Sequence, residues 1–431
     1  MGRHWRFLLV SILLILPFIS LSSHTVKNLP GFGDLPFQLE TGYVGVGEND
    51  EVQLFYYFVE SQRCPFEDPV LLLFAGGPGC SGLSPFFYLN GPLMFDYTNF
   101  NGSSPKLLLN PHTWTKVLNI IYIDAPVGTG FSYSRSKQGY YISDKQWVEH
   151  SYTFLRKWFV GHPQFQSNPL YIGGCSYSGV ITPLLVEKVY EGNKEGVRPY
   201  KNIKGYLLSS PKTDWFVDIN FRVQFAHQVA LVSDELHESI KESCKGNYVN
   251  IDPNNKKCVK DFEAFSQLIH GLNALQILEP ICVDGPSKNR RVLEDSETIL
   301  QSFPEGSASW CRGTKGHFTR CNRSLAYTID IFSVVEIHKY LSNTNLRALV
   351  YCADQDLQIP HISTQSWIKS LNLTISDTWH AIFVDDQVAG YTETYQEKDY
   401  YMTYGTGHAP EEYKPKEAYE IIDRWLSYKP I

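Results

Sequence analysis

Short, almost uninterrupted apolar runs recur along the chain, and most of them end in polar or glycine-rich residues. They occupy residues 70–74, 117–123, 170–172, 206–208 and 348–351. Such runs are typical of central parallel strands, because helices cover both faces of a parallel sheet. Two further β-rich runs, residues 42–46 and 52–59, flank Glu48, Asn49 and Asp50 and predict a hairpin.

Helical patterns alternate with these runs. Apolar residues with helical spacing fill residues 147–159 and 180–190. A last helix is expected after Pro415, and one face of it carries the apolar side chains of Ala418, Ile421, Ile422, Trp425 and Leu426. The alternation predicts an α/β fold with a central, mostly parallel sheet and right-handed crossovers.

One long segment, residues 215–345, lacks this rhythm and contains five of the nine cysteines. We expect it to be a helical, disulfide-tied insertion that forms a cap over one end of the sheet. The predicted organisation is residues 1–24 as a signal peptide, 25–214 as the first part of the α/β core, and 346–431 as its second part. The 431 residues are 43% hydrophobic and 19% charged, which is enough for a large core.

The N-terminus has the three parts of a secretory signal peptide. Arg3 and Arg6 precede an apolar run at residues 7–21, and small residues follow at 20–23. The prediction is entry into the secretory pathway, with the vacuole or the extracellular space as destination. The alternative is a membrane anchor, although the run is short for a span. No membrane span is expected after cleavage.

Cysteine spacing and charge narrow the class of partner. The cysteines lack the short paired clusters of structural zinc sites. Cys244 and Cys258 lie close together in a polar stretch, which predicts a disulfide-closed loop. The net charge of −7 offers no basic excess for nucleic acid. Sequons at Asn101, Asn322 and Asn372 are candidate glycosylation sites in a secreted chain, although such triplets also arise by chance.

The sequence Gly-Cys-Ser-Tyr-Ser-Gly at residues 174–179 lies between an apolar run and a helical pattern. A nucleophile elbow requires this context, because its tight turn projects the serine from a strained backbone. The hydroxyl of Ser176 would then stand at a helix N-terminus, where backbone N–H groups stabilise an oxyanion. Ser178 replaces the last glycine of the G-x-S-x-G pattern, and an ordinary strand–helix turn is the competing interpretation.

An acid and a histidine follow the serine in the order found in α/β hydrolases. The apolar run at 348–351 leads to Asp354 and Asp356, and His408 lies in a glycine-containing loop before the last helix. A histidine takes the serine proton in acyl transfer, and a buried acid orients it. The glycine-rich loop at 76–80 can bring a backbone N–H to a substrate carbonyl, and it lacks the ending of a phosphate loop.

These motifs together resemble the serine carboxypeptidase-like family, especially its plant branch. The resemblance covers nearly the whole mature chain and rests on residues 76–82, 110–114, 124–134, 176–179, 233–236, 354–356 and 407–408. It implies an α/β-hydrolase fold and a catalytic triad of Ser176, Asp356 and His408. It also implies an oxyanion hole made by the backbone N–H groups of Gly77 and Tyr177.

The same resemblance implies a disulfide pattern. Its pairs are Cys80–Cys321, Cys244–Cys258 and Cys282–Cys311, and it leaves unpaired the thiols of Cys64, Cys175 and Cys352. No metal and no organic cofactor is implied.

Members of this family are either carboxypeptidases or acyltransferases that use glucose esters. The peptidases bind the substrate carboxylate with an asparagine and two glutamates, and the matching positions here are Ala75, Leu89 and Cys175. Together with Gly76 they are the expected substrate-binding residues. None of the three offers a good carboxylate partner, and burying a carboxylate without partners costs roughly several kcal/mol.

We therefore expect a serine acyltransferase that moves an acyl group from a small activated ester to a small acceptor. A carboxypeptidase or a general esterase is the first alternative. The second is a catalytically quiet binding protein, because Ala75, Cys175 and Ser209 depart from the family pattern. Cys175 itself is disfavoured as a nucleophile, since the elbow aims only Ser176 at the reaction centre.

Overall fold

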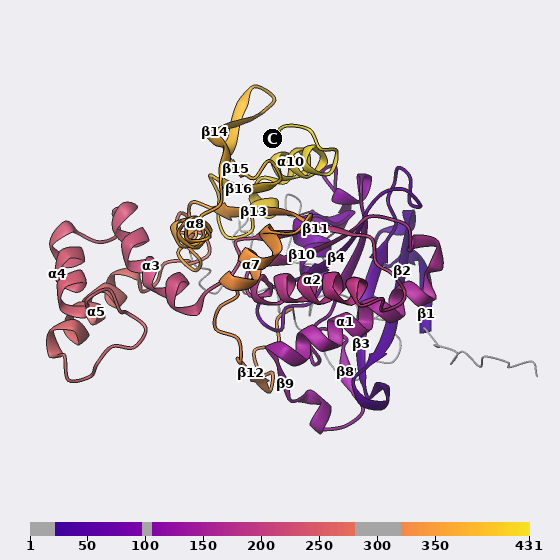
Figure 1. Ribbon diagram of the computed structural model, residues 1–431, viewed down its shortest axis with the longest axis horizontal. Coiled ribbons are helices and arrows are strands. Elements are labelled where there is room, and N and C mark those ends of the chain that lie inside the picture. Colours follow the sequence, from indigo (N-terminus) through magenta and orange to yellow (C-terminus); the bar gives the residue numbers. More distant parts are fainter. Residues whose placement is uncertain (1–21, 97–105, 281–319) are drawn as a thin grey trace, which may run out of the picture.

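The computed structural model describes residues 22–96, 106–280 and 320–431. Its centre is a 12-stranded mixed sheet (Figure 1). The six central strands run parallel, and their order across the sheet is β7 (Asn119–Ile123), β4 (Val70–Phe74), β10 (Leu170–Cys175), β11 (Ile203–Ser209), β13 (Arg347–Ala353) and β16 (Asp399–Tyr404).

Antiparallel strands extend the sheet on both sides. Next to β7 stand β3 (Val52–Val59), β2 (Gly33–Val46) and β1 (Ser22–Leu29), and the short β8 (Tyr133–Ser134) also pairs with β3. On the opposite side β16 is followed by β15 (Gln387–Tyr395) and β14 (Ile375–Val384). Smaller two-stranded sheets are formed by β5 (Leu93–Asp96) with β6 (Lys106–Leu109), and by β9 (Ile142–Ser143) with β12 (Tyr327–Thr328).

Helices cover both faces of the sheet and create two apolar cores. One core contains α1 (Asp144–Gly161) and α2 (Ser178–Lys194), which pack against strand residues such as Leu72. The other contains α10 (Pro415–Leu426), which packs against neighbouring strand residues such as Leu71. Successive strand residues thus enter opposite cores, as the period of two requires. This explains why the central strands are apolar throughout.

The segment after β11 begins with three helices that stand at one end of the molecule (Figure 1): α3 (Trp215–Gln228), α4 (Asp234–Cys244) and α5 (Lys256–Ile269). They share a small core of their own, and the disulfide Cys244–Cys258 joins α4 to α5. The chain then returns to the sheet through α7 (Val335–Ser342), and α8 (His361–Ser370) and α9 (Pro410–Tyr413) follow later.

The α/β fold predicted from the sequence is confirmed, and each predicted apolar run contains or overlaps a strand. The predicted hairpin is β2–β3, the two predicted internal helices are α1 and α2, and the last helix is α10. The sequence analysis did not foresee the antiparallel pair β14–β15. Most of β14 is exposed, and its only continuous apolar run is the short stretch at residues 381–384, which by itself does not distinguish a strand from a helix.

Several predictions lie outside the described residues: the signal peptide up to residue 21, the sequon at Asn101 and the disulfide Cys282–Cys311. The first described strand, β1, starts at Ser22. Within residues 22–96, 106–280 and 320–431, no helix is long and apolar enough to cross a membrane.

Candidate active site

Ser176 occupies a sharp turn between β10 and α2. Its backbone has a φ of 58°, a strained value for a residue other than glycine, and such strain is typical of functional turns. The Ser176 N–H donates to the Ser209 carbonyl at 2.9 Å. Gly174 must be small, because a Cβ there would lie 2.4 Å from Thr182 Oγ1. These features are those of a nucleophile elbow.

The last position of the elbow motif is filled without strain. The Ser178 hydroxyl donates to the Cys175 carbonyl at 2.7 Å, which satisfies it inside the turn. The close approach of a second chain segment occurs at Gly179, where a Cβ would lie 2.6 Å from the Lys212 carbonyl oxygen. The departure of Ser178 from the G-x-S-x-G pattern therefore leaves the turn intact.

Asp356 and His408 form a hydrogen-bonded pair beyond the ends of β13 and β16. The Asp356 Oδ2 to His408 Nδ1 distance is 2.5 Å. Asp356 is fully buried, and its other oxygen accepts from the N–H groups of Gln358 and Ile359 at 2.8 and 3.0 Å. The nearby acid, Asp354, accepts instead from the Thr406 N–H at 3.1 Å. The geometry thus selects Asp356 as the partner of the histidine.

Part of the insertion braces both loops of this pair. The His408 N–H donates to the Leu275 carbonyl at 2.7 Å, and the N–H groups of Leu357 and Gln358 donate to the Ala274 carbonyl at 2.9 Å. A Cβ on Gly407 would lie 2.8 Å from the Leu275 carbonyl oxygen. No local sequence pattern indicates this contact, because the tertiary fold brings together residues that are far apart along the chain.

The glycine-rich loop after β4 lies against the elbow. A Cβ on Gly76 would lie 2.6 Å from Ser176 Cβ, so only glycine allows this approach. Gly77 follows with a φ of 116°. The disulfide Cys80–Cys321, one of the expected pairs, ties the loop to the later part of the insertion. The loop is therefore fixed at both ends next to Ser176.

Asp124, directly after β7, holds the end of this loop through hydrogen bonds. Its Oδ1 accepts from the Ser81 hydroxyl at 2.6 Å and the Gly82 N–H at 2.8 Å, and its Oδ2 accepts from the Phe131 N–H at 2.8 Å. Burial raises the pKa of Asp124 to about 6, although these hydrogen bonds lower it. The motif at 124–134 pointed to the family, but the role of Asp124 required the structure.

Tyr177 starts the turn into α2, which directs the helix N-terminus toward the site. Its hydroxyl donates to Asp144 Oδ1 at 2.8 Å, and the Tyr327 hydroxyl donates to the same atom at 2.5 Å. Asp144 is fully buried. The side chain of Tyr177 is thereby anchored away from the site, while its backbone N–H remains the predicted oxyanion donor together with that of Gly77.

The three positions expected to distinguish peptidases lie in different surroundings. Ala75 is buried directly after β4, and Leu89 is the last residue of a π-helix at Pro85–Leu89. Cys175 precedes Ser176 and is partly exposed. Like the exposed Cys64 and the buried Cys352, it is not disulfide-bonded. Burial raises the pKa of the Cys175 thiol, and the nearby Glu411 carboxylate raises it further. The thiol therefore stays protonated, which disfavours it as a nucleophile.

Sequence reasoning missed Glu411, a second acid near the site. It lies in α9, three residues after His408, and is almost fully buried. Its carboxyl group accepts from the hydroxyls of Ser209 and Tyr351. Its proximity to His408 in the chain was the available signal, but a glutamate near a helix start is ordinarily exposed.

Two of the predicted sequons lie in the described residues. The Asn322 side chain donates from Nδ2 to the Gly128 carbonyl at 2.9 Å, so its amide nitrogen has an internal partner. Asn372 is exposed. Among the residues described, no group of three or more histidine, cysteine or acidic side chains could hold a metal ion.

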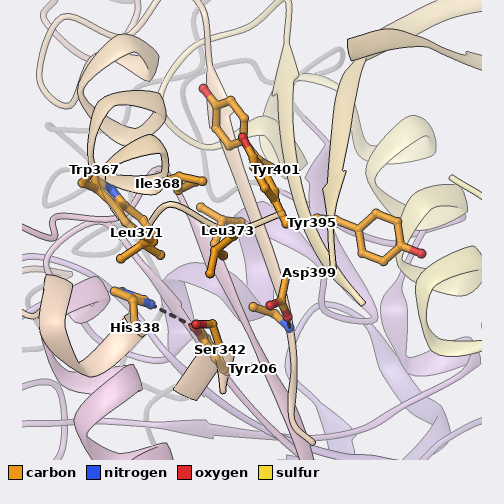
Figure 2. Close-up of a pocket in the computed structure, with 13 residues that line it drawn as sticks. Tyr206, His338, Ser342, Trp367, Ile368, Leu371, Leu373, Tyr395, Asp399 and Tyr401 are labelled. Carbon is orange, nitrogen blue, oxygen red and sulfur yellow. Dashed lines mark hydrogen bonds between the residues drawn. The ribbon is translucent and has the colours of Figure 1, made fainter. Parts of the chain in front are cut away.

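A small cavity lies away from the strand ends, between α7, α8 and the sheet (Figure 2). His338 Nδ1 and the Tyr206 hydroxyl are 2.9 Å apart in its wall, and the His338 ring stacks on Trp367. Burial lowers the pKa of His338 to about 3, so the ring is neutral. The volume of about 30 Å³ admits a water molecule but no acyl substrate.

The parallel sheet, the strained serine turn and the acid–histidine pair at the same strand edge define an α/β-hydrolase fold. The serine carboxypeptidase family model matches residues 30–428, so this chain belongs to the serine carboxypeptidase family.

Two relatives from Arabidopsis thaliana are similar over almost their whole length. Serine carboxypeptidase-like 7 is 44% identical over 428 residues, with 98% of each chain covered. Serine carboxypeptidase-like 17 is also 44% identical, with 97% of each chain covered. Among solved structures, Kex1Δp, a prohormone-processing carboxypeptidase from Saccharomyces cerevisiae, has a TM-score of 0.76 at 17% identity. The structural match covers 94% of this chain and 96% of the Kex1Δp chain, which supports the α/β-hydrolase fold.

Proposed function

We propose that the protein is a serine acyltransferase that moves an acyl group from an activated ester, such as a glucose ester, to a hydroxyl of a small acceptor. The hydrogen-bonded pair Asp356–His408, at the same sheet edge as the Ser176 elbow, carries the proposal. Ala75 and Cys175 also support the proposal, because neither offers a good hydrogen-bond partner for the carboxylate of a peptide substrate.

The first step forms an acyl-enzyme. Ser176 Oγ attacks the acyl carbonyl of the donor while His408 accepts the serine proton. Asp356 holds the imidazole through Nδ1 and stabilises its charged form. The N–H groups of Gly77 and Tyr177 donate to the developing oxyanion. The ester bond then breaks, and His408 returns the proton to the oxygen of the departing sugar.

The second step transfers the acyl group. An acceptor hydroxyl attacks the acyl carbonyl and gives its proton to His408, and Ser176 is then released when it takes this proton back. Transfer must be faster than hydrolysis, so the site must limit the access of water. The insertion contributes the segment that contacts both loops of the acid–histidine pair, and we assign the acceptor pocket to this side of the site.

The test compares two substrate classes on the purified, glycosylated protein. Acyl-glucose esters are supplied with a panel of small alcohols, and blocked dipeptides with a free carboxyl terminus are supplied separately. We expect acyl transfer from the glucose esters and little dipeptide cleavage. A Ser176→Ala variant provides the control, because it removes the nucleophile alone. Efficient dipeptide cleavage with no reaction of glucose esters would overturn the proposal.

A carboxypeptidase or esterase is the second candidate. It is favoured by membership in the serine carboxypeptidase family and by the fold shared with the carboxypeptidase Kex1Δp. If the loss of carboxylate-binding groups is what disables peptide cleavage, Cys175→Glu combined with Ala75→Asn should raise dipeptide cleavage. Each single variant is the matched control. No gain in the double variant would show that other features of the pocket decide between the two reactions.

We also propose passage through the secretory pathway, based on the N-terminal pattern at residues 1–24. Asn372 is the exposed sequon in the described residues, and we expect a glycan there. Expression of the full chain in plant cells, followed by glycosidase treatment, tests this. Asn372→Gln should remove one glycan-sized shift in mobility, and an unmodified chain that retains residues 1–24 would contradict the proposal.

A further inference from the structure

We propose that Glu411 is a positioning residue for this site. Its buried carboxyl group connects the ends of strands β11 and β13, next to the Ser176 elbow, to the segment that carries His408. The same carboxyl group lies within electrostatic reach of the histidine. The inference deepens the proposed function and rests on it in one respect: Ser176 and His408 must be the reacting pair.

The position of Glu411 is unusual for an acid. It is only 3% exposed and lies in α9, which begins two residues after His408. One carboxyl oxygen accepts from the Ser209 hydroxyl at 3.1 Å, and the other accepts from the Tyr351 hydroxyl. Both partners stand at the carboxyl ends of central strands, β11 and β13. The side chain therefore bridges the histidine loop to the sheet edge where the elbow lies.

Ser209 continues this connection to the elbow itself. Its carbonyl accepts the Ser176 N–H at 2.9 Å, and its hydroxyl lies beside the Cys175 thiol. The same residue thus contacts the backbone of Ser176 and the carboxyl group of Glu411. A displacement of the Glu411 carboxyl would shift Ser209, and a site that requires tight geometry would lose rate.

Tyr351 fixes the other side of the carboxyl group. Its own carbonyl accepts the Ser210 N–H at 2.8 Å, so the tyrosine is held to β11 as well as to Glu411. The two hydroxyls stabilise a carboxylate at this position by hydrogen bonding.

Burial raises the pKa of Glu411 above its usual range, and the Tyr351 and Ser209 hydrogen bonds and the charge of His408 offset only part of this rise. Other titratable groups within reach are Cys175 on β10 and Tyr404 on β16. In the pH range where Glu411 is ionised, its negative charge attracts the imidazolium form of His408. If that charge is removed, the imidazole should become an effective base at lower pH.

The experiment measures the second-order rate at which a fluorophosphonate labels Ser176, as a function of pH. This rate requires the serine and its base, and it does not depend on the natural donor. The Glu411→Gln variant preserves the size of the side chain. In this variant we expect the midpoint of the acid limb of the labelling rate to move to lower pH by about half a pH unit. The maximal rate should fall by about three- to tenfold, because the amide cannot accept from both hydroxyls as the carboxyl group does.

Glu393→Gln is the matched control. Glu393 is also a buried glutamate that accepts from a tyrosine hydroxyl, that of Tyr395, but it lies on β15, away from the elbow. We expect this variant to keep the wild-type profile. If Glu411→Gln folds and keeps the wild-type acid limb, or if both variants move it equally, the positioning role is wrong.

A second variant keeps the test valid if Glu411→Gln does not fold. Tyr351→Phe removes one hydroxyl that stabilises the Glu411 anion, so the acid limb should move in the same direction by a smaller amount. An unmoved limb would refute the inference. Wild-type protein that is unlabelled at every pH would refute the proposed function and the inference with it, whereas labelled wild type with unresponsive variants would refute the inference alone.

Discussion

Replacing Asp356 with asparagine probes the acid–histidine pair most sharply, because the structure dictates how the new amide must lie. Asp356 Oδ1 accepts from two backbone N–H groups, those of Gln358 and Ile359. The asparagine oxygen must take this place, since an NH₂ group there would face two donors. Its NH₂ group then points at His408 Nδ1. The imidazole is forced to accept at Nδ1 and to carry its proton on Nε2, where it can no longer act as a base.

The size of the effect follows from this change of tautomer. The variant keeps the shape and the two backbone hydrogen bonds, so the fold should remain stable. The histidine loses both its base function and the charge that stabilises imidazolium. We expect the rate of acyl-enzyme formation to fall by about 10³–10⁴-fold, which corresponds to about 4–5 kcal/mol in the activation barrier.

The assay is fluorophosphonate labelling of Ser176, with hydrolysis of a p-nitrophenyl ester as a second measure. Asp354→Asn is the matched control, because Asp354 is two residues away, is also an acid, and accepts from the Thr406 N–H instead of from His408. We expect it to lose less than about tenfold. A folded Asp356→Asn protein with near wild-type rate, or equal losses in both variants, would refute the assignment of the triad.

Three further predictions concern the glycine loop, the pH dependence of stability and a disulfide. Gly76→Ala should fold but lose about 100-fold or more in labelling rate, because its Cβ would lie 2.6 Å from Ser176 Cβ; near wild-type labelling would show that the loop can retreat. Burial raises the pKa of Asp399 to about 6 from 3.8, so its contribution to stability is complete below about pH 4 and is lost as the pH rises through 6. The excess of wild-type over Asp399→Asn unfolding free energy, from urea denaturation, should therefore fall by up to about 3 kcal/mol between pH 4 and 7, and a rise would contradict the assignment. Replacing both Cys80 and Cys321 with serine opens a link across 241 residues and should lower the unfolding free energy by about 5 kcal/mol in the chain-entropy limit; an unchanged denaturation midpoint would argue against this link.

The sequence predicted the parts of the fold whose residues carry a local signal. The run at β4 is apolar throughout because helices bury both of its faces, and its bounds were predicted to the residue. The hairpin strands β14 and β15 escaped prediction because polar residues interrupt them and leave only short apolar stretches, such as residues 381–384.

The residues of the candidate site also fall into two groups, those with a local sequence signal and those without one. Ser176 and His408 stand in short motifs whose turns need particular residues, so each was visible in the sequence. Asp356 could be separated from Asp354 only by resemblance, and the hydrogen bond to His408 now separates them by geometry. Glu411 and the segment at Leu275 act through residues far away in the chain, and no local pattern encodes such contacts.

The central claim is that Ser176 carries an acyl group from an activated ester to an acceptor. The most direct test is mass spectrometry of the intact protein after brief exposure to a panel of acyl-glucose esters, followed by addition of an acceptor alcohol. We predict an acyl adduct on the Ser176 peptide that is absent from Ser176→Ala and that disappears as the acylated acceptor forms. No adduct from any donor on folded protein that cleaves blocked dipeptides would contradict the account.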